Sequence, residues 1–456
     1  MSKNKILANL KYDFPSGLVV FLVALPLCLG IAMASGAPLF SGIIAGVVGG
    51  IVIGSLSNSH ISVSGPAAGL TAIIISSIST LGSFQAFLTA VFLAGVLQLM
   101  FGFLRAGSIS NFFPNNVIEG MLVGIGIIII LKQIPKALGS VTEVGNGLSM
   151  FGDLVKAMSE VQPGVLFISL VSLSVILLWD KVGPLLKMNF LPSALLAVIC
   201  GTLLNELFIN AGSPLAITSS EYLVELPVVH DMSDILGIFI FPDFINTENG
   251  INFSVLLKKE IWVVAATIAV VASVETLLCI EASDRMDPQK RLTDTDLELK
   301  AQGVGNMISS LIGGLPMTSV VVRSSANKNA GARTKLSTIV HGMLLLVSVM
   351  TIPTILNRIP LSVLAAILLV IGFKLAKPSV FRHFMQRGKY QAVPFLLTVV
   401  AVVFYRFVNR SCTRNGYEYF CNFAWQYETG LLFSERWIPR RRCYTHSFSP
   451  GGIVPE

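Results

Sequence analysis

The stretch that decides the fold is His60 to Ile75, HISVSGPAAGLTAIII, which changes from residues of alternating polarity to Gly65-Pro66 and then to an apolar helical run. Long apolar sequence flanks it on both sides. In lipid every backbone N–H and C=O needs a partner inside the protein, so such a junction persists at membrane depth only when protein buries it or when it lines a wet cavity. Pro66 suits the first turn of the helix that follows, where no backbone N–H is required. The free N–H groups of that turn would be available to an anion.

A second break of the same kind lies in the other half of the chain, at Gly313 to Ser325 (GGLPMTSVVVRSS). It also combines glycine and proline, a short β-branched run and small polar residues. Paired interrupted segments in the two halves of a hydrophobic chain point to the binding site of a secondary transporter. The alternative is that glycine and proline only kink two ordinary membrane helices.

The composition is that of a membrane protein. Hydrophobic residues make up 53% of the chain and charged residues 12%, whereas soluble domains carry about 25% charged residues. A membrane-spanning helix needs about 20 apolar residues. We expect about thirteen segments, one of them a strand plus short helix at 316–328, and the others near 17–35, 41–56, 66–81, 84–104, 117–134, 162–179, 191–209, 261–281, 299–312, 336–356, 360–373 and 391–405. The predicted fold is an all-α polytopic membrane protein with two short strand and half-helix breaks.

The basic residues predict the orientation. Lysine and arginine gather in one set of alternate loops, at Lys3, Lys5, Lys11, Arg105, Lys181, Lys187, Arg285, Lys290, Arg291 and from Lys374 to Lys389. By the positive-inside rule these loops and the N-terminus are cytoplasmic, in the inner (plasma) membrane. No cleavage pattern follows the short basic start, so the first span should remain in the mature protein. The net charge of +7 then requires no nucleic acid partner.

Several classes of function lack their sequence signals. The chain has no P-loop, no dinucleotide-binding glycine pattern and no nucleophile elbow. Its six cysteines have neither the spacing of a disulfide framework nor that of a metal site. We therefore expect no enzyme, no metal and no cofactor other than a coupling Na⁺ or H⁺, with energy supplied by an ion gradient or by exchange.

Two ionisable residues lie deep in apolar sequence, where charges are costly and usually functional. Glu275 sits near the centre of the 261–281 span. It is a coupling-ion or proton site, a structural partner of Arg323, or a carboxyl kept neutral by hydrogen bonds. Arg323 directly follows the second break. It attracts an anion, or it forms a salt bridge between two helices.

The motifs resemble those of the SulP (sulfate permease) family of anion transporters. The resemblance extends over roughly residues 10–404 and rests on motifs in the family's order: FPSG (14–17), ALPLCLGIA (24–32), ISVSGP (61–66), SVETLL (273–278), ELKAQGVGN (298–306) and GGLP (313–316) through Arg323. It implies a UraA-like fold of seven-plus-seven inverted repeats with interleaved core and gate helices. It also implies elevator-like alternating access, a homodimer in the lipid bilayer, and transport of sulfate, bicarbonate, chloride or dicarboxylates by symport or exchange.

The resemblance also implies a substrate site. Carried over position by position, that site consists of Ala24, Cys28, Ala68, Gly69, Thr71, Glu275, Cys279, Thr318, Ser319, Val320, Val321 and Arg323. Sodium-coupled bicarbonate members offer a hydroxyl where this chain has Cys279, and a small polar turn where it has Ser319 to Val321. Sodium therefore has fewer side-chain oxygens here, and Glu275 is favoured as a proton-coupled carboxyl.

The texture of the chain changes near residue 405. The family would continue with further helices and a soluble STAS domain, but residues 405–456 contain no lysine, are rich in arginine and tyrosine, and sustain neither helical nor strand periodicity. We expect a transporter domain at 1–404 and an atypical tail from a shifted reading frame. A truncated product of this kind, either poorly folded or inactive, is then an alternative to a working transporter. A native basic tail is the alternative.

Secondary transport of an inorganic anion of the sulfate or bicarbonate class is the function we expect from these residues and this resemblance. A channel-like member of the same fold, which binds the anion without full transport, is one alternative. A nucleobase transporter is the other, although an uncharged base has no need of the guanidinium of Arg323.

Overall fold

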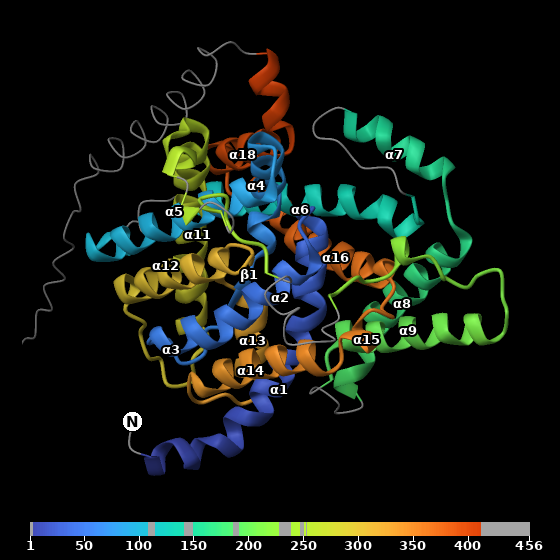
Figure 1. Ribbon diagram of the computed structural model, residues 1–456, viewed down its shortest axis with the longest axis horizontal. Helices are drawn as coiled ribbons and strands as arrows, with labels where there is room; N and C mark the ends of the chain where they lie inside the picture. The colour runs from blue at the N-terminus through green and yellow to red at the C-terminus, as the bar shows by residue number, and fades with distance from the viewer. Residues whose placement is uncertain are drawn as a thin grey trace, which may run out of the picture. The chain divides into compact units, whose positions relative to one another are not determined.

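The structure, a computed structural model, describes residues 3–107, 115–140, 149–185, 191–227, 239–246, 250–251 and 253–411 (Figure 1). The helices are α1 (Lys3–Ala34), α2 (Leu39–Val48), α3 (Gly54–Leu56), α4 (Thr71–Leu81), α5 (Phe84–Phe103), α6 (Asn115–Leu138), α7 (Ser149–Ser159), α8 (Pro163–Leu185), α9 (Ser193–Asn210), α11 (Lys259–Met286), α12 (Thr295–Leu311), α13 (Val321–Asn329), α14 (Leu336–Thr351), α15 (Pro353–Leu356), α16 (Leu361–Leu375), α17 (Pro378–Gln386) and α18 (Lys389–Ser411). The strands are β1 (Ser64–Pro66), β2 (Ile245–Asn246), β3 (Gly250–Ile251) and β4 (Met317–Ser319).

The helices confirm the predicted polytopic membrane fold. Each expected apolar segment coincides with one helix or with consecutive short ones. In the part of the chain that the structure describes, 8 helices are long and apolar enough to cross a membrane, and shorter apolar helices accompany them. The short helices α7 and α17 and the β2-β3 hairpin were not expected, because none of them shows an apolar run of spanning length.

The two breaks meet in a two-stranded antiparallel sheet. Strand β1 pairs with β4, with Ser64 opposite Ser319, Gly65 opposite Thr318 and Pro66 opposite Met317. Figure 1 places β1 among the helices, beside α2. Each strand leads into a short helix, because a 3₁₀ turn (Ala68–Leu70) and α4 follow β1, and α13 follows β4. The predicted strand and half-helix breaks are therefore confirmed.

The role expected of Pro66 was wrong. Pro66 is the last residue of β1 rather than part of the helix, and Ala67 is still extended, with φ −107° and ψ 135°. The N–H of Val320 donates to the C=O of Val63 at 3.0 Å. Because hydrogen-bonded and non-hydrogen-bonded pairs alternate in an antiparallel ladder, the pair of Pro66 and Met317 is of the second kind. Proline fits there because no ladder N–H is needed.

Two apolar clusters hold the helices together. One gathers buried residues of α5, α11, α12 and β4, and the other gathers those of α6, α8, α9 and α16, while α1 and α2 contribute to both. Helices α5 and α12 approach backbone to backbone, since a Cβ at Gly303 would lie 2.6 Å from the backbone nitrogen of Leu99. Helix α12 is thus held rigidly behind the sheet.

Residues 1–403 form one unit and residues 404–456 form a second. Helix α18 runs on to Ser411. The rest of the atypical tail expected from residue 405 lies outside the described residues, so its boundary and its shifted reading frame stay predictions.

Candidate functional site

Arg323 lies in the first turn of α13 and is completely buried. Its Nη2 donates to Sγ of Cys28 on α1 at 3.4 Å. Its Nη1 lies against Gly65 of β1, where any Cβ would collide with it. Within the described part of the chain, Nε and Nη1 have no hydrogen-bond partner and no carboxylate lies within 4.0 Å of the guanidinium. A buried guanidinium without a counter-charge favours an anion beside it.

Glu275 lies in the middle of α11 (Lys259–Met286). Its carboxyl group packs against Gly69 in the 3₁₀ turn, where a Cβ would lie 2.7 Å from Cδ of Glu275. The buried Oε2 atom has no hydrogen-bond partner in the described chain. No ion pair joins Glu275 to Arg323 among the described residues, so the salt-bridge alternative for these two residues was wrong.

Hydroxyl groups hold the second break in place. The N–H of Ser319 donates to Oγ1 of Thr276 at 3.4 Å, and the hydroxyls of Ser319 and Ser62 bond to each other. The N–H of Val63 donates to Oγ of Ser324 at 3.0 Å. Thr318 is fully buried, and its Oγ1 donates to the C=O of Ser319 at 3.1 Å. These polar groups therefore serve the backbone of the break.

The other residues expected at the site line the same region. Ala24 is buried on α1, one turn before Cys28. Oγ1 of Thr71 donates to the C=O of Ala68 at 2.6 Å, across the 3₁₀ turn that precedes α4. Cys279, one turn after Glu275, faces the backbone of Val321.

The start of α13 is open on one side. Val320 is half-buried, whereas Val321 is 37% exposed and Val322 52% exposed. The structure thus brings Cys28 beside Arg323, Gly69 beside Glu275 and Cys279 beside Val321.

The sequence reading missed the polar side chains behind the sheet. Glu298, Gln302 and Asn306 recur every four residues along α12. Gln302 donates to Ser64 of the first break and to Glu298, and Asn306 bonds to the backbone of Met317 in the second break. Their spacing was visible in the ELKAQGVGN motif. It places all three on one face of a helix, although it does not tell which element that face contacts.

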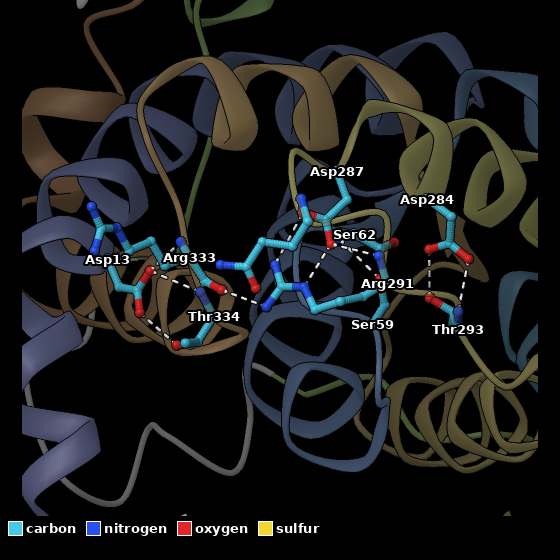
Figure 2. Close-up of polar contacts among 10 residues, drawn as sticks. Asp13, Ser59, Ser62, Asp284, Asp287, Arg291, Thr293, Arg333 and Thr334 are labelled. Atoms are coloured by element: carbon cyan, nitrogen blue, oxygen red, sulfur yellow. Dashed lines mark hydrogen bonds and ion pairs between the residues drawn. The ribbon is translucent and has the colours of Figure 1, made fainter.

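A polar cluster joins three segments at the connection between α11 and α12 (Figure 2). Asp13 of α1 accepts from the N–H groups of Arg333 and Thr334, at 2.7 and 3.1 Å. Arg291 donates from Nε to Asp287 at 2.6 Å and from Nη1 to the C=O of Arg333 at 3.0 Å. Burial alone would raise the pKa of Asp287, but hydrogen bonds from Arg291 and from the Gln289 N–H, together with the charge of Arg291, bring it below its usual value.

A cavity of about 450 Å³ lies between the α1–α2 turn and the segment 220–227. Its lining includes Glu221 and Glu225 and none of the residues expected at the site, so its charge is unfavourable for an anion. In the described residues no group of three or more His, Cys, Asp and Glu side chains is placed to hold a metal ion.

Known proteins share both the motifs and the fold. A model of the sulfate permease family matches residues 10–398. The chain belongs to this family. It is 29% identical over 373 residues to the putative sulfate transporter YvdB of Bacillus subtilis, covering 81% of this chain and 66% of that protein. It is 27% identical over 379 residues to the bicarbonate transporter BicA of Picosynechococcus sp., covering 81% and 62%. The chain therefore spans less than two thirds of the length of each of these relatives.

Solved structures confirm the fold assignment. The transmembrane domain of a cyanobacterial BicA superposes with a TM-score of 0.71 at 24% identity, covering 87% of this chain and 95% of that chain. SLC26A9 superposes with a TM-score of 0.73 at 15% identity, covering 88% and 63%. The helical membrane fold with its short two-stranded sheet is thus shared with both.

Proposed function

We propose that the chain carries a small inorganic anion, of the sulfate or bicarbonate class, across the membrane by secondary active transport. The observation that carries the proposal is Arg323, which is fully buried, lacks a carboxylate partner among the described residues, and has two nitrogens without hydrogen-bond partners. Burying such a charge uncompensated is costly. An anion would supply the missing negative charge and accept hydrogen bonds from the free N–H groups of the guanidinium.

Helix ends would add to the attraction. The first turn of α13 carries Arg323 and begins directly after β4, so its unsatisfied N–H groups and positive dipole end favour the same anion. The exposed side chains of Val321 and Val322 leave this turn open on one side. Elevator-like alternating access would then move the helices around α5, α11 and α12 against those around α6, α8 and α16.

Glu275 would couple transport to a cation. Its buried Oε2 without a partner in the described chain is suited to a proton or to sodium. The thiol of Cys279 one turn later is a weaker sodium ligand than a hydroxyl, which favours the proton. Exchange of one anion for another remains the alternative mode. The proposal includes an N-terminus in the cytoplasm, the inner membrane as location, and a homodimer.

The test is uptake by the purified full chain in liposomes. Saturable uptake of radiolabelled sulfate or bicarbonate, driven by a pH or sodium gradient or by trapped anion, is the expected result. Arg323→Ala should abolish it while the protein still inserts, whereas Arg358→Ala, at an exposed ion pair with Glu206, should leave it unchanged. Non-saturating anion flux would instead indicate a channel, and uptake of radiolabelled uracil without anion uptake a nucleobase transporter.

A further inference from the structure

The free edge of β4 is completed by side chains rather than by a third strand. Met317 and Ser319 form non-hydrogen-bonded pairs with Pro66 and Ser64, by the alternation that places Val320 in a hydrogen-bonded pair with Val63. Their N–H and C=O groups therefore point away from β1. Both residues are fully buried, so these groups need protein partners.

Asn306 of α12 takes both backbone groups of Met317. Its Oδ1 accepts the N–H of Met317 at 2.8 Å, and its Nδ2 donates to the C=O of the same residue at 3.2 Å. This is the pattern that a neighbouring strand would supply. Asn306 is 1% exposed, so no solvent replaces these bonds.

Thr276 of α11 takes the other outward amide, the N–H of Ser319. It directly follows Glu275, so the bond links β4 to the turn of α11 that carries this carboxyl group. Asn306 makes the same connection by a second route. Its Nδ2 donates to Oε1 of Gln98 on α5 at 2.6 Å, and Nε2 of Gln98 donates to Oγ of Ser273 on α11 at 3.3 Å.

Strand β1 is also held by a residue of α12. Nε2 of Gln302 donates to Oγ of Ser64 at 2.7 Å and to Oε1 of Glu298 at 3.0 Å. Glu298 also accepts from the hydroxyl of Ser57. Because α12 packs backbone to backbone on α5, this polar face is a rigid reference for both strands.

We infer that Asn306 and Thr276 are positioning residues for the anion site. They replace a third strand along β4 and so fix the first turn of α13, with Arg323, relative to Glu275 on α11. Neither residue contacts the anion itself. The expected effect on anion uptake rests on the proposed transport function, whereas the hydrogen bonds of Asn306 and Thr276 to β4 do not.

The transport test separates positioning from folding. In Asn306→Leu and Thr276→Val, the KM for radiolabelled sulfate or bicarbonate should rise about tenfold, while Vmax per inserted transporter is retained. A rise of about tenfold corresponds to losing the net contribution of one to two hydrogen bonds. The matched control is Ser310→Ala, since Ser310 is buried on the same helix and, among the described residues, its hydroxyl bonds only to the C=O of Met307. A fall in Vmax with an unchanged KM would overturn the inference. Should Asn306→Leu fail to insert, Gln98→Met and Thr276→Val carry the test.

A second measurement does not require transport. Hydrogen exchange of the purified full chain in detergent should be faster in the peptide that contains β4 in Asn306→Leu and Thr276→Val, and unchanged in Ser310→Ala. If the unaltered chain transports neither anion, the proposed function fails, while this measurement still tests whether Asn306 and Thr276 hold β4. Exchange that stays unchanged in both variants would refute this role of the two residues, whatever the transport result.

Discussion

Gly65 shows at the scale of one residue what the sequence could predict and what it could not. The sequence indicated that the SGP stretch is a break, because glycine and proline interrupt an apolar run. It did not indicate why position 65 has no side chain. Gly65 does not have a positive φ. The space that a side chain at position 65 would fill is occupied by the guanidinium of Arg323, 258 positions further along the chain. A contact between residues so far apart in sequence leaves no local pattern.

We expect Gly65→Ala to impair the site by displacing Arg323. The added methyl group would collide with Nη1, and small displacements of a positioned group cost roughly tenfold or more in function. The KM for radiolabelled sulfate or bicarbonate uptake should rise by at least that factor. Gly152→Ala is the matched control, because nothing lies within 4 Å of a Cβ at that position. Equal KM values in the two variants would show that Arg323 is not held by this contact.

Glu275→Gln should separate coupling from anion movement. The substitution keeps the shape of the side chain but removes the charge that a proton or sodium ion would compensate. Uptake should no longer follow an imposed pH or sodium gradient, while exchange of labelled for unlabelled anion continues. Because no ion pair to Arg323 is present in the described residues, we expect normal insertion. Gradient-driven uptake at the original rate would rule out the coupling role.

Helix α12 shows at the scale of one element why a site can be only partly predicted. The polar residues Glu298, Gln302 and Asn306 were legible as one helical face. The strands that Gln302 and Asn306 contact are three residues long and pair across more than half of the chain. Neither the pairing nor its register follows from periodicity, which reports only local structure. The carried-over site residues were found through motifs, and the residues that position them were not.

The α11–α12 connection should stabilise the protein in a pH-dependent way. The pKa of Asp287 lies below its usual value, so its contribution is present above the unfolded pKa of about 3.9 and is lost as the pH falls through the folded pKa. Asp287→Asn should lower the Tm in detergent at pH 7 by the equivalent of about 1 kcal/mol. The difference from the unaltered chain should shrink on acidification below about pH 4.

Glu281→Gln is the control for this prediction. Glu281 and Arg285 have the same four-residue spacing as Asp287 and Arg291, but their side chains are largely exposed, so their ion pair adds little. A Tm loss in Glu281→Gln as large as that in Asp287→Asn would contradict the role given to the burial of Asp287 and to the hydrogen bond from Arg291 to the C=O of Arg333.

At the scale of the whole molecule, the hydrophobic pattern was the most informative feature. Long apolar runs predicted the membrane helices, because lipid requires about 20 apolar residues for each crossing. The pattern said nothing of α7 and α17, which are too short to cross. It also could not show that residues of two distant breaks form one sheet. The direction in which the helices cross is predicted instead by the basic residues of the loops.

The distribution of basic residues predicts that α17 faces the cytoplasm and α7 the opposite side. Both helices carry exposed positions, at Met385 on α17 and Met158 on α7. In intact cells a membrane-impermeant maleimide should therefore label Met158→Cys and not Met385→Cys, and permeabilised cells should show labelling of both. The unaltered chain, with its six native cysteines, gives the background. The opposite pattern would invert the orientation, and labelling of both sites in intact cells would mean that the helices between them do not cross as an odd number of spans.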